Sequence, residues 1–192
     1  MPTPSARQLR TQFAYALAEG WLSAFHLGAA KWAIPEEVLL GIASRETAMR
    51  NIAGDFAGGH PHGFGVMQID DRGVYGQWCR TGLWKDAREA IAKGSSVLSA
   101  KREAIRDSYG DTIHLAGRRT PLTFVGPHLT DNELLATSIA AYNVGMLAYY
   151  GQAKYDDPDR FTTGKDYSRD VLARSKVFAK LLGEVDADEP RH

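Results

Sequence analysis

The chain has little of three things: cysteine, net charge and long apolar runs. Cys79 is the single cysteine among 192 residues, so an intramolecular disulfide is excluded. Lysine plus arginine (23) equals aspartate plus glutamate (23), which argues against a nucleic-acid-binding protein, since such proteins normally carry a basic excess. No stretch approaches transmembrane length, so we expect no stable membrane insertion.

Metal-ligand patterns and an export signal are missing as well. With one cysteine and six scattered histidines, no C-x₂-C or H-E-x-x-H pattern occurs, so we expect no metal and no cofactor. Glu19 and His26 interrupt the apolar residues near the N-terminus, which therefore does not read as a signal peptide. The single cysteine favours a protein made in a reducing compartment.

The most informative stretch that is present runs from Ile34 to Asp71. Its first half predicts a helix with Pro35 at the first helical position, where the missing N–H costs nothing. Glu36 and Glu37 follow, near the positive end of the helix dipole. Three- and four-residue spacings then place six side chains on one face: Val38, Leu39, Ile42, Ala43, Glu46 and Met49.

Glu46 is the one charged residue on this face. A buried carboxylate needs a partner or binds a proton, because desolvation raises its pKa. A carboxylic acid that stays protonated near neutral pH is suited to general acid catalysis. The alternative is a structural glutamate at the edge of the face, which reaches water or pairs with Arg45 or Arg50.

Two further carboxylates follow Glu46 closely. Asp55 is predicted in a loop flanked by glycine, and Asp70 closes the run Gly63-Phe64-Gly65-Val66-Met67-Gln68-Ile69-Asp70. Two glycines around one aromatic residue predict a turn at which backbone and ligand can approach closely. The three carboxylates could therefore converge on one groove. The alternative is that Asp55 caps a turn and Asp70 pairs with Arg72.

Five blocks of the sequence, in order and spacing, resemble goose-type lysozyme and its relatives, the soluble lytic transglycosylases. The resemblance covers Ile34 to Leu182. The blocks are Ser44-Arg45-Glu46, Gly54-Asp55, Gly63 to Asp70, Ala141-Tyr142-Asn143-Val144-Gly145, and Asp166 to Arg174.

The resemblance implies an α+β, mostly α, lysozyme-like fold with a small β-hairpin or three-stranded sheet at Gly63 to Asp71. It also implies a peptidoglycan hydrolase that cuts the β-1,4 bond between N-acetylmuramic acid and N-acetylglucosamine with inversion. Glu46 would be the general acid, and Asp70 with Asp55 would position the attacking water. The implied substrate-binding residues are Phe64, Met67, Gln68, Tyr142, Asn143 and Tyr167.

Two other functions stay open at this point. In a lytic transglycosylase, the C6 hydroxyl of the substrate replaces water and gives a 1,6-anhydro product. Such an enzyme needs the glutamate but not the pair of aspartates, so Asp55 and Asp70 favour a hydrolase, while Asp71 is interpreted as a solvated neighbour. The more distant alternative is a non-catalytic glycan-binding or phage-structural module, against which the intact Glu46 argues.

The chain departs from the many animal goose-type lysozymes that are disulfide-bonded secreted proteins. With Cys79 alone, it resembles a bacterial or phage member. We expect it to act at the bacterial cell wall after release or export by a route other than a signal peptide. A phage endolysin fits this expectation, and an injected effector or an autolysin fits it equally.

A length of 192 residues predicts a single domain, 1–192, which we expect to be monomeric. Helical spacing predicts an amphipathic helix from Ser5 to Leu27 within an N-terminal segment, 1–30. An ordered loop is predicted over 72–84. Its aromatic residues could stack on sugars or belong to the core; they are Tyr75, Trp78 and Trp84.

The remaining segments are predicted from spacing and capping signals. A helix is expected over Lys85–Tyr109, then a loop or small hairpin over 111–127. A capping box of Thr130 and Glu133 begins the next helix, and Gly145 ends it. A polar loop over 151–165 precedes a last helix, Asp166 to Leu182, which Gly183 would end before a frayed tail, 184–192.

Overall fold

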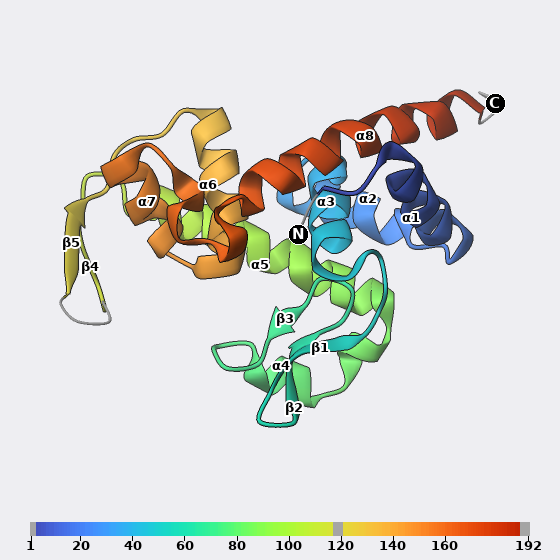
Figure 1. Cartoon of the computed structure of the whole chain (residues 1–192), viewed down its shortest axis with the longest axis horizontal. Helices are drawn as coiled ribbons and strands as arrows, with labels where there is room; N and C mark the ends of the chain where they lie inside the picture. The colour runs from blue at the N-terminus through green and yellow to red at the C-terminus, as the bar shows by residue number, and fades with distance from the viewer. Residues whose placement is uncertain (1–2, 117–120, 189–192) are drawn as a thin grey trace. The chain divides into compact units, whose positions relative to one another are not determined.

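A computed structural model describes residues 3–116 and 121–188 (Figure 1). The fold is mostly helical, as predicted, and contains two small antiparallel sheets. Contacts divide the described chain into two compact units. Unit A comprises residues 3–96 and 171–188, and unit B comprises residues 97–170.

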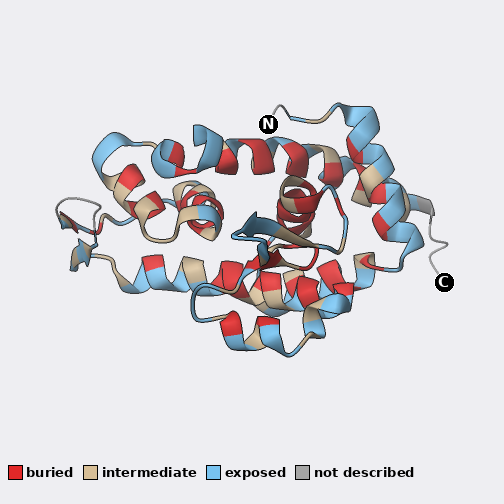
Figure 2. Cartoon of the chain, turned by 60° about the horizontal axis from the view of Figure 1, so that its bottom comes forward, coloured by how far each residue is buried: buried red, intermediate tan, exposed pale blue. Residues whose placement is uncertain are grey.

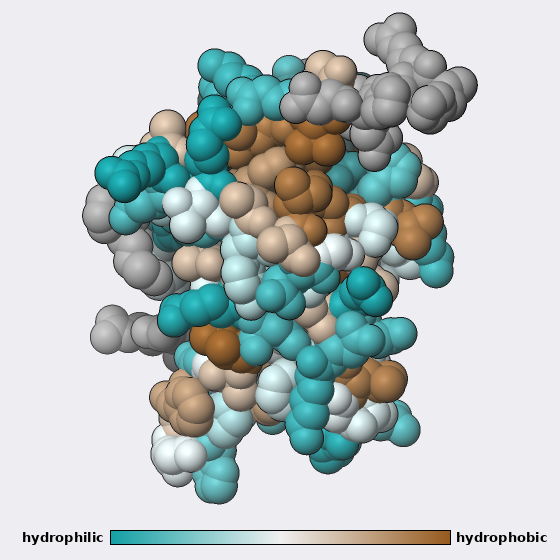
Figure 3. Space-filling model, turned by 90° about the vertical axis from the view of Figure 1, so that its right-hand side faces the viewer, coloured by the Kyte–Doolittle hydropathy of each residue, from teal (hydrophilic) through white to brown (hydrophobic). Residues whose placement is uncertain are grey.

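Unit A begins with two helices, α1 (Ala6–Ala18) and α2 (Leu22–Trp32), so the prediction of one helix from Ser5 to Leu27 was wrong. The break lies at Gly20, whose φ of +69° is a left-handed conformation that glycine adopts without steric cost. Exposed hydrophobic side chains remain on both helices: Tyr15, Leu17 and Leu27. Figure 3 views the side of the molecule to which α1 and α2 belong and shows brown hydrophobic surface among hydrophilic residues.

Helix α3 (Glu36–Thr47) is the most deeply buried element of unit A, since every residue from Val38 to Ser44 is buried. Pro35 is the N-cap residue, one position before the helix rather than its first residue. The helix ends because Ala48 adopts a left-handed conformation, with φ of 53°. Met49, which was predicted on the apolar face of this helix, therefore lies beyond its end, although its side chain is fully buried.

A three-stranded antiparallel sheet follows, formed by β1 (Ala53–Ala57), β2 (His60–Phe64) and β3 (Ile69–Asp70) in that order. The predicted small sheet is confirmed, but it begins ten residues earlier than predicted. Asp55 consequently lies in a strand and not in a loop. Its φ of 49° is left-handed and locally distorts the strand.

Two short helices replace the loop predicted over 72–84: α4 (Gly76–Arg80) and the 3₁₀ helix η1 (Leu83–Lys85). The absence of a clear period hid them, because each spans little more than one turn. The long helix α5 (Ala87–Asp107) follows as predicted, and residues 87–96 of it belong to unit A.

The last helix, α8 (Tyr167–Asp188), is longer than predicted, and its residues from Val171 onward belong to unit A. Gly183 does not end it; one glycine costs a helix only about 1 kcal/mol. Glu184, expected in a frayed tail, lies within the helix and pairs with Arg10 at 2.9 Å. The rest of the predicted tail, 189–192, lies outside the described residues.

Unit B contains a hairpin of β4 (Thr112–Leu115) and β5 (Leu122–Val125), the second of the two structures foreseen for this segment. Helix α6 (Asp131–Val144) has the predicted capping box and ends at Gly145. Most of the predicted polar loop is helical, in α7 (Leu147–Tyr155) and two 3₁₀ helices, η2 (Pro158–Phe161) and η3 (Thr163–Lys165).

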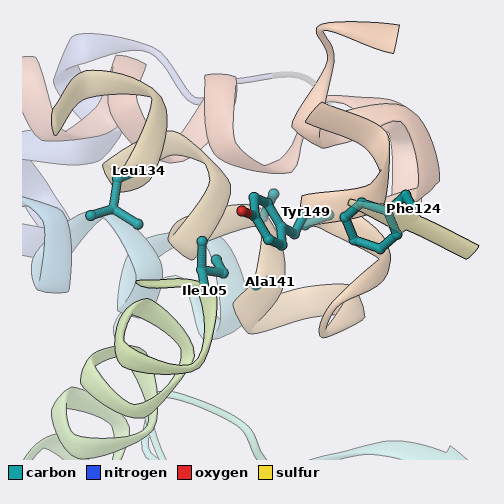
Figure 4. Packing of buried hydrophobic residues seen from close by; sticks show 7 residues of the cluster. Ile105, Phe124, Leu134, Ala141 and Tyr149 are labelled. Carbon is teal, nitrogen blue, oxygen red and sulfur yellow. The ribbon is translucent and has the colours of Figure 1, made fainter. Parts of the chain in front are cut away.

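The core of unit B is built around the Tyr149 ring, which is fully buried and meets Phe124 edge to face at 5.5 Å (Figure 4). The Tyr149 hydroxyl donates a hydrogen bond to the Pro127 carbonyl at 2.6 Å. Burial raises the pKa of this phenol to about 12. The apolar members of the cluster are Ile105, Phe124, Leu134, Ala140, Ala141 and Ala148.

A buried carboxylate, Asp159, anchors the beginning of α8 within unit B. It accepts hydrogen bonds from the Ser168 N–H and hydroxyl, both at 2.8 Å, and from the Arg169 N–H at 3.1 Å. A carboxylate at this position satisfies free N–H groups and complements the helix dipole. Figure 2 shows buried residues in red recurring among exposed ones along the long helices, as amphipathic helices require.

Candidate active site

Glu46 lies in the last turn of α3, and its residue is half-buried. The next residue ties this turn to the sheet: the Thr47 hydroxyl lies 2.9 Å from the Val66 carbonyl and 3.1 Å from that of Ala43. Val66 belongs to the connection between β2 and β3. The end of the helix that carries Glu46 is therefore held against the connection that leads to Asp70.

Arg174 of α8 fixes the same helix turn from the other side. Its guanidinium donates to the Ser44 carbonyl at 3.1 Å and to the Ser44 hydroxyl at 2.8 Å, while that hydroxyl donates to Gln12 at 2.6 Å. Arg174 is only 3% exposed, so these bonds hold a buried charge two residues before Glu46. The sequence analysis included Arg174 in the last of the five blocks but did not assign it this positioning role.

The structure brings Asp55 and Asp70 together through Arg72. Arg72 Nη2 lies 2.6 Å from Asp55 Oδ2 and 2.6 Å from Asp70 Oδ2, and Arg72 Nε donates to Asp70 Oδ1 at 3.0 Å. The side-chain hydrogen bonds from Arg72 lower the pKa of Asp70, and those with Asp70 raise the pKa of Arg72. Asp70 is thereby favoured in its ionised form.

The pairing of Asp70 with Arg72 matches the structural alternative considered for this aspartate. The pairing does not remove the carboxylates from water, since the side chains of Asp55 and Asp70 are 57% and 51% exposed. Arg72 is the residue that sequence reasoning undervalued. Its position two residues after Asp70 was the available signal.

Gly54 and Gly63 leave room for the side chain of Gln68. A Cβ atom on Gly54 or Gly63 would lie 2.4 Å from Gln68 Oε1, so a larger residue at either position would displace the amide. Gln68 Nε2 donates to the carbonyls of Ile52 at 3.0 Å and Gly65 at 2.9 Å. The sequence predicted a close approach between this backbone and a ligand. In the structure the side-chain amide of Gln68 makes a close approach to the backbone.

The two apolar residues of this run differ in exposure. Phe64 is half-buried and packs against Trp84, with ring centroids 5.3 Å apart. Met67 is fully buried, and its Sδ occupies the space that a Cβ on Gly94 would need, 2.4 Å away. Phe64 can therefore offer a surface to a ligand, whereas Met67 supports the sheet from within the core.

Asp71 was interpreted as a solvated neighbour, and this was wrong. His62 Nδ1 lies 2.8 Å from Asp71 Oδ1, and the two side chains are half-buried, at 24% and 29% exposed. The pair joins β2 to the residue that follows β3. It gives Asp71 a structural partner distinct from the Arg72 that holds Asp70.

The other predicted substrate-binding residues belong to unit B. Tyr142 and Asn143 lie at the C-terminal end of α6, as expected, with Tyr142 half-buried and Asn143 exposed. Asn143 Oδ1 accepts a hydrogen bond from the Thr163 N–H at 3.0 Å, which orients its amide. Tyr167, at the start of α8, is only 2% exposed and packs within the protein.

No group of three or more histidine, cysteine, aspartate or glutamate side chains that could hold a metal occurs within residues 3–116 and 121–188. In the same described residues, no helix has the length and apolar character to cross a membrane. Burial raises the pKa of the Cys79 thiol to about 11, so this cysteine stays protonated at neutral pH.

Comparison with known proteins adds independent support for the family. No protein-family model matches the chain. It is 30% identical over 150 residues to lysozyme g of Takifugu rubripes, covering 76% of this chain and 67% of that protein. It is 28% identical to lysozyme g of Epinephelus coioides, covering 80% and 72%, and 28% identical to that of Casuarius casuarius, covering 77% and 66%.

These alignments span about two thirds of each relative and most of this chain. The mostly helical fold, with a three-stranded sheet directly after α3, agrees with the family that the five sequence blocks resemble. The chain therefore belongs to the goose-type lysozyme (lysozyme g) family and is a glycosidase of that type.

Proposed function

We propose that this protein cleaves the β-1,4 bond between N-acetylmuramic acid and N-acetylglucosamine in peptidoglycan, with Glu46 as general acid. The observation that carries the proposal is the cluster of Asp55, Asp70 and Arg72 on the sheet that Thr47 ties to the end of α3. Two half-exposed carboxylates that share one arginine can hold a water molecule. The relatives' name, lysozyme, supports the bacterial wall as the substrate.

In the proposed reaction, Glu46 gives its proton to the glycosidic oxygen as the bond from that oxygen to C1 breaks. The sugar ring passes through a transition state like an oxocarbenium ion, and water attacks C1 from the opposite face. Asp70, with Asp55, orients this water and accepts its proton. The configuration at C1 is inverted because the water attacks from the face opposite to the leaving oxygen. In an inverting enzyme the acid and the base stand about 6.5–9.5 Å apart, which leaves room for the water.

In each unit, further side chains are proposed to bind the substrate by accepting or donating hydrogen bonds or by packing on a sugar. Phe64 offers a half-buried ring, and the oriented amide of Asn143 suits an N-acetyl group or a hydroxyl. Gln68 uses its Nε2 on backbone carbonyls, and its Oε1, which lies against Gly54 and Gly63, is the acceptor that we propose for the substrate. Tyr142 and Tyr167 of unit B and Met67 of unit A are the remaining residues that we propose for substrate binding; Tyr167 and Met67 are buried and would support the residues that touch the sugar.

A second candidate, lytic transglycosylation, is favoured by one observation. Arg72 neutralises part of the charge of both aspartates, and a transglycosylase needs neither of them. In that reaction the C6 hydroxyl of the muramic acid attacks C1 of the same sugar. The product is a 1,6-anhydro sugar, and no water is consumed.

Mass spectrometry of digested peptidoglycan distinguishes the two reactions. We expect reducing muramic acid ends with the wild-type enzyme, and a sharp loss of rate in Asp70→Asn. The double variant Asp55→Asn/Asp70→Asn should be nearly inactive. Predominantly anhydro ends, lighter by one water, would show that the reaction is transglycosylation and not hydrolysis. Glu46 would keep its role as the acid. An absence of wall lysis by the folded wild-type protein would instead indicate a non-catalytic glycan-binding module.

A further inference from the structure

Unit A contains a cavity of about 460 Å³ that includes none of the residues assigned above to catalysis or substrate binding. Its walls come from α2, α4 and α5, and we call it the tryptophan pocket. The volume lies within the range of about 300–1,000 Å³ that is typical of small-molecule sites. The lining residues that matter here are Leu27, Lys31, Trp32, Trp78, Arg88 and Lys93.

Close packing of α2 on α5 forms the base of the tryptophan pocket. A Cβ on Gly28 would lie 2.5 Å from Ser95 Oγ, so only glycine lets the two helices approach this closely. Beyond this contact the helices carry larger side chains, among them Leu27, which is 67% exposed. The pocket is therefore part of the helix packing and needs no rearrangement to exist.

Positive charge predominates around the tryptophan pocket. Lys31, Arg88 and Lys93 line it, and Glu89 is the single acidic residue among the lining side chains. Within the part of the chain that the structure describes, none of the three cations forms an ion pair. The excess positive charge is thus left for a ligand or for solvent.

Each tryptophan of the pocket has a lysine ammonium group over its ring. Lys31 Nζ lies 5.2 Å from the centroid of the Trp32 ring. Lys93 Nζ lies 4.7 Å from the ring of Tyr75 and 5.9 Å from that of Trp78. Trp32 and Trp78 are both half-buried, so part of each indole remains accessible. An indole ring can contact the apolar face of a ligand. A nearby ammonium group can at the same time pair with an anionic group of that ligand.

We propose that the tryptophan pocket binds an anionic saccharide, specifically a sugar of the muramic acid type that carries a carboxylate. The C–H face of a pyranose ring is apolar and would pack on an indole, removing both surfaces from water. The carboxylate would pair with Lys31, Arg88 or Lys93. The choice of a wall saccharide rests on the proposed function; the pocket and its charge do not.

Binding is tested by NMR titration of the indole N–H signals of the full-length protein, assigned by single tryptophan-to-phenylalanine variants. N-acetylmuramic acid should shift the signals of Trp32 and Trp78 in a saturable manner. Neutral N-acetylglucosamine should bind at least tenfold more weakly. Lys31→Glu should weaken the binding of N-acetylmuramic acid about tenfold, because it replaces an attractive charge with a repulsive one. A tenfold change in Kd corresponds to about 1.4 kcal/mol.

Lys180→Glu is the matched control, because Lys180 is an exposed lysine of the same unit outside the pocket. It should leave the binding unchanged. Equal affinity for the neutral and the anionic sugar, or an equal effect of both charge reversals, would overturn the proposal. So would shifts confined to Trp84, which packs on Phe64. A preference for N-acetylglucosamine 1-phosphate over N-acetylmuramic acid would overturn the assignment of a carboxylate.

The failure of this proposal can be separated from a failure of the proposed function. Lys31→Glu should cleave a soluble, short glycan at the wild-type rate. Glu46→Gln should lose that activity and still show the shifts of Trp32 and Trp78. A wild-type protein that binds the sugar without cleaving peptidoglycan would refute the enzymatic proposal and keep the binding site.

Discussion

The carboxylate of Asp70 and the guanidinium of Arg72 form a pair with two short contacts: 2.6 Å from Nη2 to Oδ2 and 3.0 Å from Nε to Oδ1. The residues are two positions apart, where β3 ends, and the Arg72 N–H also donates to Asp70 at 2.8 Å. Because the same Nη2 reaches Asp55, Arg72 determines how the two carboxylates are placed. Several consequences of the proposed mechanism depend on this pair.

Replacing Arg72 by glutamine should change the pH dependence of cleavage. The hydrogen bonds from Arg72 lower the pKa of Asp70, so without them this pKa rises toward its ordinary value. If ionised Asp70 is the base, the acid limb of the kcat/KM profile should move to higher pH. Arg7→Gln, an exposed change on α1, is the control. An unmoved acid limb in Arg72→Gln would exclude Asp70 as the base.

The same pair should contribute slightly to stability at neutral pH. The folded-state pKa of Asp70 lies below its unfolded value, so its contribution is present above the unfolded pKa and is lost as the pH falls through the folded pKa. Asp70 and Arg72 are each about half exposed, which limits the effect to about 1 kcal/mol or less. Urea unfolding of wild type and Arg72→Gln should differ by this amount at pH 7 and converge in strong acid.

Glu46→Gln should abolish wall lysis without unfolding the protein, because the amide keeps the shape but cannot donate a proton. General acid catalysis usually contributes about 10²- to 10⁴-fold, so the rate should fall by at least this factor. Turbidity assays on cell walls measure it, with circular dichroism as the test of folding. Glu37→Gln, in the first turn of the same helix, is the control. Activity of Glu46→Gln near that of Glu37→Gln would refute the role of Glu46.

Asp159→Ala should destabilise the protein strongly. Asp159 is fully buried and accepts three hydrogen bonds from Ser168 and Arg169 at the start of α8. Hydrogen bonds to a charged group each contribute about 1.5–3 kcal/mol, and their loss leaves buried donors unsatisfied. We expect a loss of at least about 3 kcal/mol in the free energy of unfolding. Asp156→Ala, at the C-cap of α7, should cost clearly less; equal losses would contradict the anchoring role.

Phe13→Ala should lower the free energy of unfolding by about 3–5 kcal/mol, as should Trp21→Ala. Phe13 is 5% exposed and packs on Phe178 of α8, with ring centroids 6.3 Å apart, and Trp21 is 7% exposed. Thermal or urea unfolding measures the loss. Unchanged melting in both variants would show that the N-terminal helices are a detachable extension.

Deletion of residues 184–192 should cost little stability, although the helix continues through the first of them. The pair between Arg10 and Glu184 is exposed, at 64% and 55%, and exposed pairs contribute only about 0–1 kcal/mol. The comparison is with Arg10→Ala, which removes the same pair in the full chain. A loss much larger than that of Arg10→Ala would mean that the end of α8 packs more firmly than its exposure indicates.

Local signals in the sequence predicted the elements that depend on neighbouring residues. The capping box of Thr130 and Glu133 fixes the start of α6, because both partners lie within one helical turn. The apolar spacing after Pro35 predicted α3, because residues three and four positions apart lie on the same face of a helix. Where the signal spans barely one turn, as in α4 and η1, or where a positive φ at Gly20 divides a long periodic stretch, the prediction failed.

The sequence by itself determined the family, the helical composition and the identity of the three candidate carboxylates, since these follow from residue order and spacing. Only the tertiary structure decided what those residues touch. Ser44 is 130 positions from Arg174, and Asp55 is 17 from Arg72, and no local propensity couples residues so far apart. Such contacts arise when packed elements bring charged groups within hydrogen-bond reach, because a buried or clustered charge must be paired.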